Sequence, residues 1–277
     1  MVNVAFFVAA SALYLGATLA YRAAWVDKVR RFREAATRLL LAAVAVHGLG
    51  ILVRWLESGY PPLANAFESL SFYAWSLAVA YLLWEWKGGR PGLGALVTPI
   101  ALGAIVVAAV FPKRIRPLLP VLHSHWLGIH VTISFLAYAV FTLAFASAVA
   151  FLRQDYTLKR RKGVGWGQGL PSLVMLETLG WRFALAGFFL LTGSLVSGSI
   201  WAVRAWGVPW VWQPQQVATL VTWIVYATYF LTRRQLHWRG RRPAWLLVAG
   251  FMAVVMTFVG VDLLLPGGYH SFLLGGD

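Results

Sequence analysis

Apolar residues along this chain gather into eight long runs that shorter polar segments separate. Each run is close to the roughly 20 residues that an α-helix needs to cross the hydrocarbon core of a bilayer. The runs cover residues 3–21, 39–56, 68–86, 93–111, 126–152, 181–203, 217–233 and 244–265. This pattern predicts an all-α integral membrane protein, in which a bundle of about eight transmembrane helices forms one polytopic membrane domain over residues 1–277.

The composition also favours a membrane protein over a soluble one. Hydrophobic residues make up 60% of the 277 residues, charged residues make up only 12%, and the mean hydropathy is +0.70. A soluble domain carries about 25% charged residues. The chain has no cysteine, which excludes disulfides, thiolate metal sites and cysteine nucleophiles.

Basic residues are distributed unevenly between the two sides that alternating runs define. The more basic side holds 19 of the 24 lysines and arginines: Arg22, Lys28, Arg30, Arg31, Arg33, Arg38, Lys87, Arg90, Arg153, Lys159, Arg160, Arg161, Lys162, Arg182, Arg233, Arg234, Arg239, Arg241 and Arg242. The positive-inside rule assigns that side to the cytoplasm. Both termini are therefore expected on the outer, extracytoplasmic side of the cell (inner) membrane. Topology accounts for the net charge of +15, so no nucleic-acid partner is expected.

Residues 199–216 are unusually rich in tryptophan and lie between two apolar runs. The tryptophans are Trp201, Trp206, Trp210 and Trp212. One glycine and two prolines interrupt the segment, and such residues end helices. The pattern predicts an extracytoplasmic loop whose rings form a flat aromatic shelf at the membrane surface, suited to a planar, apolar ligand. Tryptophans are also common as anchors at membrane interfaces, so both interpretations stay open.

Two of the six histidines are placed to approach this shelf from different helices. His130 lies at the outer end of the fifth run, and His270 follows the last run. Neutral imidazole is a common axial ligand of haem iron, and a haem held from both faces needs one histidine on each side. Histidines near helix ends also serve as polar caps, so spacing alone leaves this hypothesis open.

His47 and Arg54 lie within the second run at a spacing that puts them on one helix face. Polar residues at membrane depth usually face a bundle interior or a cavity. His47 is therefore a candidate cofactor-binding residue, or it bonds to a neighbouring helix. Arg54 is a candidate to receive a ligand carboxylate, or its long side chain reaches the membrane interface.

Four stretches in this order, on separate helices, resemble the cytochrome c assembly family, which includes CcsA, CcmC and CcmF. They are residues 47–70, residues 124–131, the Trp-rich segment continuing through residue 227, and residues 269–271. The resemblance implies that the chain handles haem, expected as haem b, over the Trp-rich (WWD) segment. It implies His130 and His270 as axial ligands of the haem iron, and apocytochrome c and a second assembly subunit as partners besides lipid and haem.

Two departures from the family pattern keep a second function open. Residues 213–216 read Gln-Pro-Gln-Gln where the family usually has Asp-Pro-Lys-Glu, and Leu231 stands where CcsA-like chains carry a further histidine. A compact HemX-like regulator of haem biosynthesis is the alternative. It would bind a haem-biosynthesis enzyme through the basic segments 22–38 and 153–170. No side-chain catalytic machinery is evident, and whether the chain is an enzyme stays open. The absence of an inverted repeat disfavours a third function, that of a permease.

Overall fold

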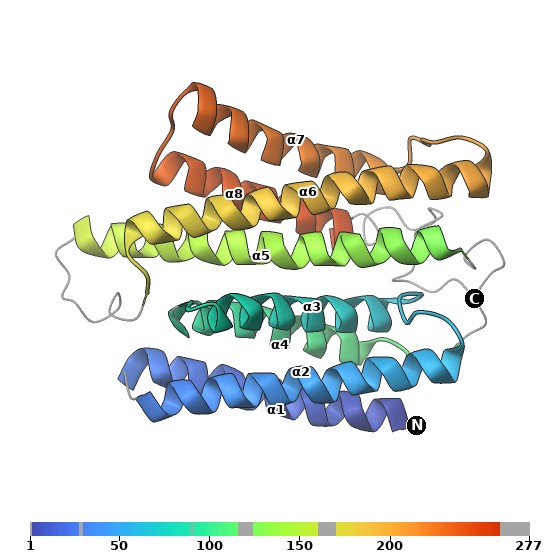
Figure 1. The fold of residues 1–277 in the computed structure, drawn as a ribbon, viewed down its shortest axis with the longest axis horizontal. Coiled ribbons are helices and arrows are strands. Elements are labelled where there is room, and N and C mark those ends of the chain that lie inside the picture. The colour runs from blue at the N-terminus through green and yellow to red at the C-terminus, as the bar shows by residue number, and fades with distance from the viewer. Residues whose placement is uncertain (1, 28–29, 90, 116–123, 160–169, 261–277) are drawn as a thin grey trace.

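The computed structural model describes residues 2–27, 30–89, 91–115, 124–159 and 170–260, and eight α-helices account for most of them (Figure 1). They are α1 (Val2–Asp27), α2 (Arg30–Ser58), α3 (Ala66–Trp86), α4 (Gly94–Val110), α5 (His125–Lys159), α6 (Leu173–Trp206), α7 (Pro214–Gln235) and α8 (Arg241–Val255). A short 3-10 helix, η1 (Pro91–Leu93), precedes α4, and a π-helical turn, η3 (Met256–Gly260), follows α8. No strand occurs in these ranges, so the all-α prediction is confirmed for them.

Six helical segments are long and apolar enough to cross a membrane. They are Val2–Val26, Arg31–Ser58, Ala66–Trp86, His125–Lys159, Leu173–Trp206 and Arg241–Phe258. α4 is apolar but shorter, with 17 residues, and α7 is not among the six. The chain is therefore a multi-pass membrane protein. The predicted count of about eight crossings and the predicted orientation of the termini stay predictions.

Successive helices run in opposite directions, so the bundle has two distinct ends (Figure 1). The starts of α1, α3, α5 and α7 lie at one end, together with the last residues of α2, α4 and α6. The described segments rich in lysine and arginine lie at the opposite end, which agrees with the alternation that the apolar runs predicted. We call the end that holds the starts of α1, α3, α5 and α7 the α5 N-terminal end.

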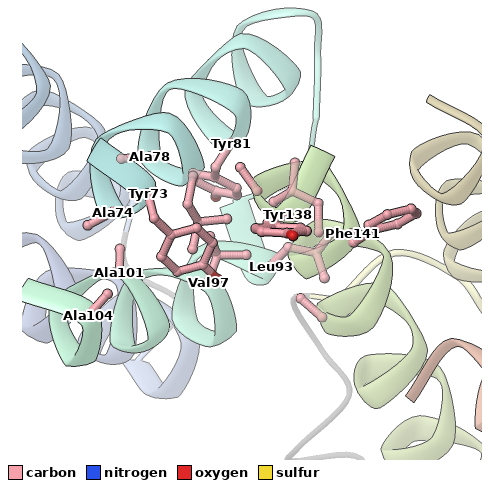
Figure 2. Close-up of a cluster of buried hydrophobic side chains, with 14 of the residues drawn as sticks. Tyr73, Ala74, Ala78, Tyr81, Leu93, Val97, Ala101, Ala104, Tyr138 and Phe141 are labelled. Carbon is pink, nitrogen blue, oxygen red and sulfur yellow. The ribbon is translucent and has the colours of Figure 1, made fainter. Parts of the chain in front are cut away.

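The helices form two groups, α1–α4 and α5–α8, that meet mainly along α3 and α5 (Figure 1). In the first group α1 packs most extensively against α2, and in the second α5 packs against α6. Figure 2 shows this region, with buried tyrosines of α3 and α5 and with buried alanines where α3 meets α4. Small residues let helix backbones approach closely in a membrane. The hydroxyl of Tyr73 lies 2.7 Å from that of Thr142, so this junction has a polar link as well as apolar packing.

The Trp-rich stretch is more helical than the sequence predicted. α6 continues through Trp206, and only residues 207–213 connect it to α7. Gly207 ends α6 in a left-handed conformation with φ of 77°, which glycine adopts without the steric cost other residues meet. Pro214 then begins α7, where its fixed φ and missing N–H suit the first helical position. The expectation of one continuous loop over residues 199–216 was therefore wrong, because nothing breaks the helix before Gly207.

Candidate functional site

A cavity of about 1000 Å³ opens between the two helix groups at the α5 N-terminal end. Its wall combines the 59–64 segment, the first half of α5, the last turns of α6 and the first residues of α7. Phe72 and Tyr138 contribute aromatic rings, and Phe258 of η3 contributes another. Ligand pockets of drug-sized molecules measure about 300–1,000 Å³ and are mostly apolar with a few polar groups. The cavity is therefore large enough for a sizeable apolar ligand.

His130 lines this cavity from the second turn of α5 and is half-buried. Its Nδ1 lies 2.8 Å from the backbone carbonyl oxygen of Ser194 on α6. Ser134, one turn further along α5, donates to the carbonyl of His130 at 2.7 Å and shares a 2.6 Å hydroxyl contact with Ser194. These contacts tie His130 to the neighbouring helix and fix where its ring lies.

The four tryptophans of the predicted shelf form two edge-on pairs. Trp201 and Trp206 have ring centroids 4.7 Å apart at 67°, and Trp210 and Trp212 have centroids 5.8 Å apart at 78°. Trp201, which is 4% exposed, and Trp210 line the cavity, whereas Trp212 is 76% exposed. The expectation of one flat aromatic shelf was wrong, because the helix and the turn after it aim consecutive rings in different directions.

The short connection between α6 and α7 is held by a glutamine side chain. The backbone N–H of Val211 donates to Oε1 of Gln216 at 3.0 Å, and the N–H of Gln213 donates to the Val211 carbonyl at 2.6 Å. Gln215 and Gln216 also line the cavity. Two of the amides in residues 213–216 therefore belong to the cavity wall.

Arg54 lies outside the large cavity, where it bonds α2 to α3 and to the segment after α4. It is 3% exposed, and its Nε and Nη2 each lie 2.7 Å from Oε1 of Glu68. Its Nη1 donates to the Lys113 carbonyl at 2.9 Å. Oε2 of Glu68 accepts the N–H of Ala64 at 2.7 Å, and Asn65 caps the start of α3. Arg54 thus fixes the segment before α3, and the structure does not bring it to the cavity that holds His130.

His47 also lies apart from the large cavity. It is 2% exposed, with Nε2 2.7 Å from the hydroxyl of Ser71 and Nδ1 3.4 Å from the hydroxyl of Tyr14. It lines a void of about 20 Å³ that it shares with Arg54, a size that suits a single water molecule. Both ring nitrogens have a protein partner, so this histidine is satisfied by its neighbours.

Of the four remaining histidines, the structure describes two, and one of these lines the cavity. His125, the first residue of α5, is exposed and lines the cavity mouth. His237 is exposed in the short connection between α7 and α8. His123 and His270 lie outside the described residues, so the predicted pairing of His130 with His270 stays a prediction. Within the described ranges, no three histidine, aspartate or glutamate side chains are grouped to hold a metal ion.

Comparison with known proteins identifies the family. Residues 63–268 match the family described as Cytochrome C assembly protein. The chain belongs to this cytochrome c assembly family. It is 33% identical to the cytochrome c biogenesis protein CcsA of Thermosynechococcus vestitus, with 85% of this chain and 86% of that protein covered. It is 35% identical to CcsA of Prochlorococcus marinus strain MIT 9303, with 85% and 83% covered.

A solved structure named Cytochrome c Heme Lyase CcmF shares the fold, with a TM-score of 0.67 and 18% sequence identity. The likeness covers 92% of this chain but only 46% of that one. The region that matches the family, residues 63–268, contains α3 through α8 and most of the cavity wall. His47 and Arg54 precede that region.

Sequence reasoning named His130, which the structure places on the cavity wall, but it did not predict the residues of α6 that contact its ring. Ser194 and Gly198 look like ordinary small residues in an apolar run, and such residues pack helices together in many membrane proteins. Their importance follows from which turn of α6 faces His130, and the spacing within one helix does not reveal that register. The small residues in the sixth run were the only available signal.

Proposed function

We propose that this chain binds haem in the large cavity and holds it at the outer face of the membrane for transfer to apocytochrome c. The observation that supports the proposal is the position of His130, which lines a large apolar cavity while Nδ1 is bonded to a backbone carbonyl. Histidines that ligate metals usually donate their other ring N–H to such a partner. The family and its CcsA relatives give the biological setting.

The cavity residues suit a planar apolar ligand with a central metal. Trp201, Trp210 and Phe72 provide aromatic surface, and Gln215, Gln216 and Ser199 provide a few polar groups. Haem b, when bound, supplies an iron that takes imidazole as an axial ligand and vinyl groups that form thioethers with protein cysteines. Since this chain has no cysteine, any thiol in such a reaction comes from the apocytochrome. The chain's own contribution is to bind, orient and shield the ligand.

His270 is proposed as the second axial ligand on the grounds of the family resemblance. Phe258 lines the cavity, and His270 follows it by twelve positions in the sequence. An extended segment of that length spans at most about 40 Å, so the chain is long enough to return to the cavity. A cell-membrane location and a second assembly subunit are proposed on the same grounds.

A regulator resembling HemX is the alternative, and it differs in where its partner binds. It requires a cytoplasmic enzyme to contact the basic end of the bundle, whereas haem delivery requires an occupied cavity at the α5 N-terminal end. No contact among the described residues favours the regulator. The two functions are separated by whether the purified protein binds haem through His130.

The test is an optical titration of the detergent-purified protein with haem, recorded oxidised and reduced. We expect a low-spin bis-histidine spectrum for the natural chain, loss of that spectrum in His130→Ala, and no stable binding in His130→Ala/His270→Ala. His237→Asn is the matched control, because His237 is exposed far from the cavity and asparagine tolerates its φ of 53°. An unchanged spectrum in His130→Ala would refute the proposed site. Absence of haem binding by the natural chain would favour the regulator.

A further inference from the structure

The contact between His130 and α6 determines which ring nitrogen carries the proton. A carbonyl oxygen only accepts hydrogen bonds, so at 2.8 Å from the Ser194 carbonyl the Nδ1 of His130 must be the donor. In a neutral imidazole the proton on Nδ1 leaves the lone pair on Nε2. Among the residues that the structure describes, none is hydrogen-bonded to Nε2 of His130, while the side chain lines the cavity.

Gly198 makes this contact possible. A Cβ atom at position 198 would lie 2.8 Å from both Nδ1 and Cε1 of His130, closer than Cβ atoms come to non-bonded neighbours in folded proteins. The ring therefore rests on the bare backbone of α6 and reaches the carbonyl of Ser194, one turn earlier in the helix. Any side chain at position 198 would push the ring away from that carbonyl.

The hydroxyl groups around His130 do not replace this contact. Ser194 Oγ lies 3.3 Å from Nδ1, further than the carbonyl oxygen of the same residue. The hydroxyl of Ser197 donates to the Ser194 carbonyl at 3.1 Å, so this oxygen accepts from a side chain of its own helix as well as from His130. The backbone, and not a side chain, is the main partner of the ring.

We infer that Gly198 and the Ser194 carbonyl are positioning elements that lock His130 in the Nδ1–H tautomer and present Nε2 to a metal centre in the cavity. Both act through His130. That the metal is the iron of a haem rests on the proposed function, whereas the tautomer and the role of Gly198 are properties of the chain alone. Partners of this kind fix the tautomer and orientation of metal-bound histidines.

The first experiment compares two alanine substitutions in the same helix. Gly198→Ala places a methyl group against the His130 ring, whereas a Cβ at Gly193 meets only Ile133, at an ordinary 3.9 Å. Loss of a partner that orients a ligand typically weakens metal binding by about 10- to 100-fold. We expect that loss of haem affinity and a shift away from the low-spin spectrum in Gly198→Ala, with natural behaviour in Gly193→Ala. Equal affinities and spectra in the two variants would overturn the inference.

The second experiment needs no haem. Nitrogen NMR of histidine-labelled apoprotein, at a pH where the ring is neutral, reports which nitrogen is protonated, and His130→Gln assigns the signal. We expect the Nδ1–H tautomer in the natural chain and in Ser194→Ala, which keeps the carbonyl, and a change in Gly198→Ala. An Nε2–H tautomer in the natural chain would overturn the inference even if Gly198→Ala failed to fold. If the natural chain binds no haem, the proposed function fails while this tautomer test still decides the inference.

Discussion

His47 lies between α1 and α3, and each of its ring nitrogens faces a hydroxyl group. The shorter contact, 2.7 Å, joins Nε2 to Ser71, and the longer, 3.4 Å, joins Nδ1 to Tyr14. A polar side chain inside a bilayer must find a partner within the protein, because the lipid offers none. His130 differs because one of its nitrogens is bonded to the protein while its side chain borders a large cavity. Two histidines in similar apolar runs therefore have different surroundings.

Ser71→Ala should lower stability because it leaves Nε2 of His47 without its nearest partner. Hydrogen bonds between helices in membranes are worth about 0.6–2 kcal/mol, so we expect a loss of about 1 kcal/mol, measured by SDS-induced unfolding in micelles. Ser76→Ala is the control on the same helix: its hydroxyl is buried without a hydrogen-bond partner among the described residues, and its removal should be neutral or stabilising. Equal losses in both variants would show that the contact with His47 is not stabilising.

The junction of α6 and α7 shows what a sequence pattern predicts and what it does not. The apolar runs predicted eight helices, and each run overlaps one helix of the structure. The point at which α6 ends was missed, because tryptophan itself does not stop a helix and Gly207 was only one of several candidate breakers. The cavity was not predicted at all. It depends on how α5 packs on α6 and how the 59–64 segment faces them, and such relations between distant elements leave no periodic signal.

The side chain of Gln216 should stabilise the folded conformation of the connection between α6 and α7. Its Oε1 accepts the N–H of Val211, and Gln216→Glu keeps an acceptor at the same reach whereas Gln216→Ala removes it. We expect faster hydrogen exchange at the Val211 amide in Gln216→Ala, and exchange close to that of the natural chain in Gln216→Glu. An opening free energy lower by about 1 kcal/mol corresponds to exchange about fivefold faster. Fast exchange in the glutamate variant as well would mean that the amide group itself is required.

At the scale of the whole molecule, the two helix groups give the cavity its position. The group α1–α4 supplies the 59–64 segment of the cavity wall, next to the Arg54–Glu68 ion pair. The group α5–α8 supplies His130 and the tryptophans. The groups touch mainly through α3 and α5, and residues of both groups line the cavity at one end. The side of the membrane that this end faces is set by the direction in which the bundle is inserted, and the number of crossings is a separate question. α4 and α7 decide this number, because the other six helices meet the length and hydropathy that a span requires.

If α4 and α7 both cross the membrane, the residues that flank each of them lie on opposite sides. The chain has no cysteine, so single cysteines can be introduced at exposed positions: Lys87 and Arg114 around α4, and Val208 and Gln235 around α7. With a membrane-impermeant maleimide added to right-side-out vesicles, we expect labelling at positions 114 and 208 and protection at positions 87 and 235 until the vesicles are lysed. Labelling of both members of a pair from one side would show that the helix between them does not cross. Protection at position 208 with labelling at position 235 would mean that the cavity end of the bundle faces the cytoplasm. Haem held by His130 would then not meet an apocytochrome on the outer side of the cell membrane.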